Sequence, residues 1–197
     1  MAPLRLFIAA DTSSEQKTAA MELMEALKKG IGFTKARPAW VRPDGLHLTL
    51  KFLGNVESER VDEIVRAVEP AVLGVPVLRF ELKGLGVFPS PHRPQVLWVG
   101  VSAGNKEMCG LAATVEQVLT RLGFAPEQRP FHPHLTLARM KSLSGAEAMM
   151  DVVHSHRRAD LGAADLRHLT LYQSRLAPTG ATYQVLHRWP LRAQDPA

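Results

Sequence analysis

The hydrophobic and polar residues of this chain recur with two periods, and these periods predict where its strands and helices lie. Strands are predicted where apolar residues run together or alternate with polar ones, at residues 4–10, 46–53, 77–87, 96–101, 132–140, 166–175 and 182–191. Helices are predicted where apolar residues recur every three to four positions, at residues 12–30, 58–68, 105–122 and 144–154. The segment 30–45 is predicted to be irregular, because Pro38 and Pro43 oppose helix formation there.

The order of these elements indicates an α+β fold. Two pairs of predicted strands, within residues 77–101 and 166–191, follow each other without a helix between them, which favours antiparallel sheets over a doubly wound parallel sheet. No linker or low-complexity tract divides the chain, so a single domain over residues 1–197 is predicted. Each half contains a similar strand followed by a helix, and we therefore expect two related lobes.

The composition is ordinary for a soluble protein and slightly favours an anionic partner. Of the 197 residues 46% are hydrophobic, enough for a substantial core, and the net charge of +5 suits RNA or a phosphorylated small molecule. Cys109 is the only cysteine, so no disulfide can form within the chain and a reducing compartment is expected. The first apolar run, residues 6–10, is too short for a signal peptide or a membrane span, and we expect a cytoplasmic protein without membrane association.

One tetrapeptide occurs three times in the chain. His47-Leu48-Thr49-Leu50 returns 87 positions later as His134-Leu135-Thr136-Leu137, and the same letters stand at residues 168–171. In a strand the histidine and threonine of each copy share one face, while the two leucines anchor the other. Two such strands around one cavity would supply an acid, a base and two hydrogen-bond donors, which suffice for phosphoryl transfer without a metal. A half-exposed strand also produces this pattern by chance.

Longer segments around the first two copies extend the pattern. They are Leu46-His47-Leu48-Thr49-Leu50-Lys51-Phe52-Leu53-Gly54, Pro133-His134-Leu135-Thr136-Leu137-Ala138-Arg139, Gly86-Val87-Phe88-Pro89, and residues 96–100 and 171–174. Together they resemble the two-histidine (2H) phosphoesterase superfamily, and within it the RNA 2′,3′-cyclic phosphodiesterases, also named 2′-5′ RNA ligases. The resemblance covers nearly the whole chain, and it implies a bilobal α+β fold with two antiparallel sheets and flanking helices around a central cleft.

The resemblance also implies a reaction and its residues. His47 and His134 would be catalytic, converting the 2′,3′-cyclic phosphate end of an RNA to a 2′-phosphate without a metal or another cofactor. His47 would give a proton to the leaving 3′-oxygen and His134 would take one from water, an order that two similar motifs cannot fix. Thr49 and Thr136 would bind the non-bridging phosphate oxygens. RNA ends, tRNA fragments among them, are the implied partners, and we expect a monomer because no coiled-coil heptad is present.

Three further residues lie close to these motifs. Arg139 would face away from His134 in a straight strand, but it would reach the phosphate if the strand ends or bulges there. Lys51 would share the face of His47 and contact the same anion. His168 falls where the family has no catalytic histidine, and it is predicted to lie on a hydrated edge of the sheet.

Other functions fit parts of the sequence. His132 and His134 share one strand face, so with His47 they would form a zinc site of a metal hydrolase. The cations and aromatic residues of segment 33–42 suit an RNA-end-binding module without turnover, or else Trp40 packs into the core of the protein. The same two histidines would also join RNA ends through a 2′-5′ linkage, because a catalyst accelerates both directions of a reaction.

Overall fold

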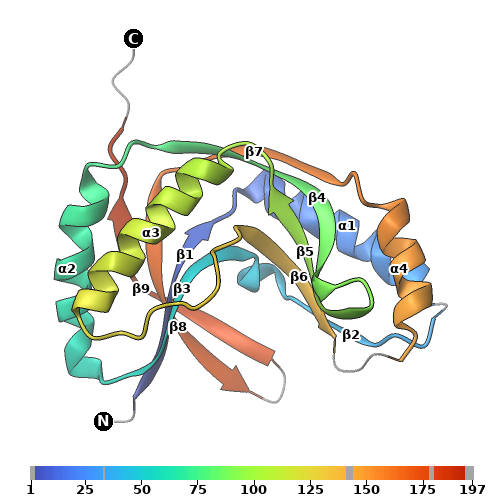
Figure 1. Cartoon of the computed structure of the whole chain (residues 1–197), viewed down its shortest axis with the longest axis horizontal. Coiled ribbons are helices and arrows are strands. Elements are labelled where there is room, and N and C mark those ends of the chain that lie inside the picture. Colours follow the sequence, from blue (N-terminus) through green and yellow to red (C-terminus); the bar gives the residue numbers. More distant parts are fainter. Residues whose placement is uncertain (1–2, 33, 141–143, 178–179, 194–197) are drawn as a thin grey trace.

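The computed structural model describes residues 3–32, 34–140, 144–177 and 180–193, which form two antiparallel β-sheets and four α-helices (Figure 1). The first sheet has the strand order β3 (His47–Val56), β1 (Leu4–Asp11), β8 (His168–Ala177) and β9 (Gly180–Pro190). The second has the order β2 (Pro38–Trp40), β6 (His134–Met140), β5 (Arg93–Val101), β4 (Leu78–Ser90) and β7 (Asp160–Leu166). The predicted α+β class with two antiparallel sheets is confirmed.

Each sheet is covered by one helix from each half of the chain. Helices α2 (Val61–Leu73) and α3 (Asn105–Arg121) contact each other and strands β9 and β3 of the first sheet. Helices α1 (Ser14–Gly32) and α4 (Ala146–Ser155) contact each other and strands β7 and β4 of the second. Figure 1 shows these two pairs at opposite ends of the molecule. None of the described helices is both long and apolar enough to cross a lipid bilayer.

The motif strands are anchored in the hydrophobic core by their leucines. Leu48 of β3 and both Leu135 and Leu137 of β6 are fully buried, and one continuous core contains all three. Their burial leaves the histidine and threonine positions of both strands on the opposite, partly exposed face. This alternation agrees with the sequence prediction.

Several local predictions differ from the structure, among them the end of helix α2, which continues past residue 68 to Leu73 with Pro70 inside it. Helix α1 continues past Gly30, where the close approach of α4 explains the glycine, since a Cβ there would lie 2.7 Å from a methyl carbon of Val152. Strands β2 and β7 were not predicted, because both are edge strands and neither shows the alternation of a half-buried strand. Strand β2 lies in the segment expected to be irregular, and its Trp40 packs beside the Lys28 ammonium, whereas Phe33 lies outside the described residues. Short 3₁₀ turns at Pro43–Gly45 and Ser58–Arg60 complete the fold.

Candidate active site

A cavity of about 1050 Å³ lies between strands β3 and β6, and both predicted histidines line it. His47 and Thr49 contribute from β3, while His134 and Thr136 contribute from β6. Helix α3, the end of the β4–β5 hairpin and the segment 127–132 complete the wall. The first two tetrapeptide copies are thus brought together from different sheets, as the sequence predicts.

A β-bulge in β6 turns Arg139 into the same cavity. Leu137 is an extra residue in this strand, because Thr136 and Ala138 pair with consecutive residues of β5. The bulge shifts the alternation by one position, so Ala138 is buried and the exposed Arg139 lies on the cavity side with His134. The condition on which Arg139 was predicted to reach a bound phosphate is therefore met.

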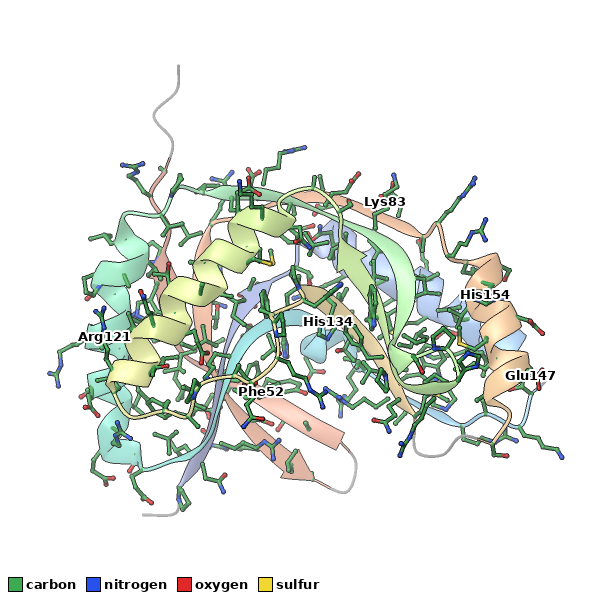
Figure 2. The ribbon with its side chains drawn as sticks, viewed as in Figure 1. Phe52, Lys83, Arg121, His134, Glu147 and His154 are labelled. Atoms are coloured by element: carbon green, nitrogen blue, oxygen red, sulfur yellow. The ribbon has the colours of Figure 1, made fainter. Side chains whose placement is uncertain are left out.

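The equivalent bulge in β3 has the opposite consequence for Lys51. Leu50 is an extra residue, because Thr49 and Lys51 pair with consecutive residues of β1. Phe52 consequently turns to the cavity, which it lines, whereas Lys51 does not share the face of His47. The side chain of Phe52 is 52% exposed, and Figure 2 shows it in the central region of the molecule that also holds the histidine of β6.

Lys51 forms a buried structural contact, so its predicted place beside the anion is wrong. Its side chain is 3% exposed, and its ammonium lies 2.9 Å from the carboxylate of Glu116 on α3. It also donates a hydrogen bond of 2.7 Å to the carbonyl oxygen of Ala125. The lysine thus connects β3 to the loop that precedes β6.

His134 is held in one tautomer by the backbone. Its Nδ1 lies 2.7 Å from the carbonyl oxygen of His132, which can only accept, so Nδ1 carries the hydrogen and Nε2 of the neutral ring has a free lone pair. The edge of the ring meets Phe88 at a centroid distance of 5.1 Å. Burial lowers the pKa of His134 below its ordinary value, and the hydrogen bond to His132 partly opposes this effect.

His47 is held by aromatic rings instead. It stacks on Phe7 at a centroid distance of 4.8 Å and meets the edge of Tyr183 at 5.1 Å. Its buried Nδ1 has no hydrogen-bond partner in the described part of the chain. Burial lowers the pKa of His47 to about 4, against the opposing effect of the Asp11 carboxylate. Both imidazoles are therefore neutral near pH 7 in the ligand-free protein.

The third tetrapeptide copy does not line the cavity. His168 begins β8, which lies between β1 and β9 in the interior of its sheet, so its predicted position at a sheet edge is wrong. Its Nε2 lies 3.1 Å from a carboxylate oxygen of Asp11. Among the described residues, no group of three or more His, Cys, Asp or Glu side chains is placed to share a metal ion, so the alternative zinc site at His47, His132 and His134 is not assembled.

Sequence reasoning missed two residues that line this cavity and one that lies beside it. Phe52 and Phe88 lie in quoted family segments but received no role, and Asp11 received none either. The tetrapeptide repeat contains a usable signal for Phe52, which stands two positions after the last leucine of its copy, as Arg139 does in the other. For Asp11 there is no such signal, because its contacts with β8 span more than 150 positions.

The two halves of the chain also match one family model. The model of the LigT-like phosphoesterases matches residues 11–98 and, a second time, residues 99–183. The chain belongs to the LigT-like phosphoesterase family. The predicted membership in the 2H phosphoesterases is thereby confirmed, and the double match agrees with the two bulged motif strands.

Relatives of this LigT-like phosphoesterase extend over nearly its whole length. An RNA 2′,3′-cyclic phosphodiesterase of Aeropyrum pernix is 35% identical over 161 residues, covering 82% of this chain and 90% of the relative. One of Methanocaldococcus jannaschii is 32% identical and covers 94% of this chain and 100% of the relative. The structure of TT0787 of Thermus thermophilus has a TM-score of 0.77 at 26% identity, covering 97% of this chain and 100% of that one. Escherichia coli LigT complexed with 3′-AMP has a TM-score of 0.72 at 26% identity, covering 96% and 98%.

Proposed function

We propose that this protein hydrolyses RNA 2′,3′-cyclic phosphate ends to 2′-phosphomonoesters. The observation that carries the proposal is the placement of His47 and His134 on the wall of one cavity, each with a threonine two positions further along its strand. The relatives that bear this activity in their names match the chain over most of its length. The cavity supplies the groups that opening a cyclic phosphodiester requires.

His134 is the proposed base, because its fixed tautomer leaves Nε2 free to accept a proton. Water attacks phosphorus and passes a proton to this atom, while the bond from phosphorus to the 3′-oxygen breaks. His47 gives a proton to the departing 3′-oxygen, which leaves the phosphate on the 2′-oxygen. Proton exchange with solvent then returns both rings to their starting states.

His47 must be protonated to serve as the acid, although its pKa in the free protein is about 4. A bound phosphodiester carries a negative charge, and an opposite charge at close range raises the pKa of an imidazole. Substrate binding therefore creates the acid at the place where it is needed. The low pKa of the free protein and the acidic role of His47 are compatible for this reason.

The remaining cavity residues suit the two parts of the RNA end, its cyclic phosphate and its nucleoside. Thr49, Thr136 and Arg139 provide two hydroxyls and a guanidinium for the non-bridging phosphate oxygens, on which charge develops during the reaction. Phe52 presents an exposed ring in the same cavity, and such a ring stacks on a nucleobase of any identity. We assign Phe52 to the nucleoside that carries the cyclic phosphate.

The test is hydrolysis of a short RNA with a 2′,3′-cyclic phosphate end, in excess chelator, with identification of the phosphate position in the product. His47→Ala and His134→Ala should abolish formation of the 2′-phosphate. His154→Ala is the matched control, because His154 is an exposed histidine on α4 and lies outside the cavity (Figure 2). RNA binding without turnover would favour the binding module, and inhibition by the chelator would favour a metal hydrolase.

The reverse reaction is tested in the same experiment by adding an RNA with a free 5′-hydroxyl and looking for a 2′-5′-linked product. Bulk water favours hydrolysis, so we propose hydrolysis as the net direction. That the protein works as a monomeric single domain in the cytoplasm, with tRNA fragments among its substrates, stays a prediction.

A further inference from the structure

Three side chains of β8 converge on the carboxylate of Asp11. Thr170 donates a hydrogen bond of 2.8 Å to Oδ2 of Asp11, and Nε2 of His168 lies 3.1 Å from the same oxygen. The hydroxyl of Tyr172 donates to Oδ1 at 2.5 Å. These three residues alternate along β8, so they share one face of the strand. The third tetrapeptide copy thus supplies the histidine and threonine that hold an acidic residue.

Asp11 stands next to the proposed acid. Strands β1 and β3 are paired in a register that sets Asp11 opposite His47. Since paired residues project from the same face of a sheet, the carboxylate and the imidazole are neighbours. The side chain of Asp11 is 20% exposed, so its charge is only partly screened by water.

The hydrogen bonds to Asp11 also hold one of the aromatic rings that pack near His47. Tyr172, whose hydroxyl binds Asp11, stacks on Phe7 at a centroid distance of 5.2 Å, and Phe7 in turn stacks on His47. Burial and the nearby Asp11 raise the pKa of Tyr172, so its hydroxyl keeps the proton that it donates. Asp11 therefore connects to His47 in two ways, through its charge and through the rings.

Other ionisable groups also face His47. Lys17 of α1 disfavours its protonation, while Asp44, between β2 and β3, favours it more weakly than Asp11 does. Tyr183 of β9 meets the ring edge-on, and burial raises its pKa, so it is uncharged near neutrality. Among these groups Asp11 makes the largest contribution in favour of the cation.

We propose that Asp11 is the positioning residue of His47, and that the His168-Leu169-Thr170-Leu171 copy serves to hold Asp11 in place. The proposal rests on the proposed function, because it assigns Asp11 to the step in which His47 protonates the leaving oxygen. Asp11 touches neither the substrate nor the reacting atoms. It acts by stabilising the imidazolium of His47 that forms when the phosphate binds.

The test compares Asp11→Asn with the wild-type protein in two measurements. An NMR titration of the His47 imidazole reads its pKa without any turnover, and steady-state kinetics on the cyclic-phosphate RNA separate kcat from KM. The asparagine is nearly isosteric but uncharged, so we expect the pKa of His47 to fall and kcat to drop about tenfold, since a nearby opposite charge shifts a pKa by about one unit or more. KM should change less than about twofold, because the phosphate contacts are not altered.

Two further variants separate this role from a structural one. Asp62→Asn removes the same charge from the exposed face of α2, outside the cavity, and should leave the His47 pKa and kcat unchanged. Asp11→Glu keeps the charge but displaces it, so both values should lie between those of the wild type and Asp11→Asn. If Asp11→Asn does not fold, Asp11→Glu alone must still lower the His47 pKa.

The outcomes are distinguishable from failure of the proposed function. An unchanged His47 pKa in Asp11→Asn, or an equal loss of kcat in Asp62→Asn, would overturn the role of Asp11. A wild-type protein without turnover on cyclic-phosphate RNA would overturn the proposed function instead. In that case the NMR titration would still decide whether Asp11 acts on His47.

Discussion

His134 donates the hydrogen on Nδ1 to the carbonyl oxygen of His132 across 2.7 Å. Because a carbonyl cannot donate, this contact selects one tautomer and presents the lone pair of Nε2. His47 has no such contact in the described residues and lies instead against Phe7, with its pKa lowered to about 4. Two histidines from identical tetrapeptides thus differ in their surroundings, and this difference supports separate roles as base and acid.

The first prediction concerns the titration of the two histidines. In the free protein NMR should give a pKa of about 4 for His47 and a value below the ordinary 6.5 for His134, because burial disfavours both cations. Adding inorganic phosphate should raise the pKa of His47. Binding then takes up a proton on His47, so the contribution of this residue to phosphate affinity should fall as the pH rises above about 4, and become constant above the pKa of the complex.

The exposed His154 provides the internal reference for this titration, because it lies outside the cavity and phosphate bound there should not change its NMR signal. Phosphate affinity that is independent of pH throughout this range, with His47 unshifted in the complex, would contradict the proposed creation of the acid by substrate binding.

The second prediction concerns the two threonines. Thr49→Val and Thr136→Val keep the β-branched shape that suits a strand but remove a donor from the cavity. Each should lower kcat by about tenfold to a thousandfold, as expected for the loss of one transition-state hydrogen bond. Thr182→Val in β9, an exposed threonine outside the cavity, is the control and should retain full activity. If all three variants had the same kcat, the hydroxyls of the two cavity threonines would not act in catalysis, and these residues would serve only as strand formers.

The sequence predicted the fold and the paired motifs because both depend on local periodicity. It did not predict how side chains lie beyond the motifs, because a bulge at the last leucine of the tetrapeptide in each motif strand shifts the alternation. The bulges arise from pairing with β1 and β5, which are distant in sequence from the strands that they affect. An unbroken strand alternation therefore predicts, wrongly, that Lys51 faces the site. The same alternation lets Arg139 reach the cavity only if the strand bulges.

The third prediction concerns Arg139. Arg139→Gln should raise KM for the cyclic-phosphate RNA by about tenfold to a hundredfold, the usual range for losing a charge-assisted hydrogen bond to an anion. Arg121→Gln makes the same change at the end of α3, away from the cavity (Figure 2), and should have little effect. A larger loss of kcat than of substrate affinity would instead mean that Arg139 acts mainly on the transition state.

The fourth prediction concerns Phe52, which occupies in β3 the place that Arg139 occupies in β6. Phe52→Ala should weaken binding of the RNA end about tenfold or more, because stacking on one base contributes about 1–3 kcal/mol. Affinity for inorganic phosphate should not change, since that ligand has no base. Equal weakening of both ligands, measured by calorimetry, would show that the substitution disturbs the cavity rather than a nucleoside contact.

The last prediction concerns Lys51, whose ammonium binds the Glu116 carboxylate and the Ala125 carbonyl. Glu116 also accepts a hydrogen bond of 2.8 Å from the backbone nitrogen of Glu127, so this pair anchors the loop that lines the cavity. Lys51→Met keeps the apolar part of the side chain and removes its charge. The free energy of unfolding should fall by about 2 kcal/mol, less than for a fully buried pair, because Glu116 is 26% exposed and water can solvate it.

A double-mutant cycle of Lys51→Met and Glu116→Gln, measured by urea unfolding, decides whether Lys51 contacts Glu116 or the bound anion. If the lysine acts through Glu116, the two substitutions should destabilise the protein by less together than the sum of their separate effects. KM should then rise in both single variants, because the same loop is released in each. If Lys51→Met left stability unchanged but abolished phosphate binding, the lysine would contact the anion, as a straight β3 strand predicts. The bulge at Leu50 leads us to expect the first result.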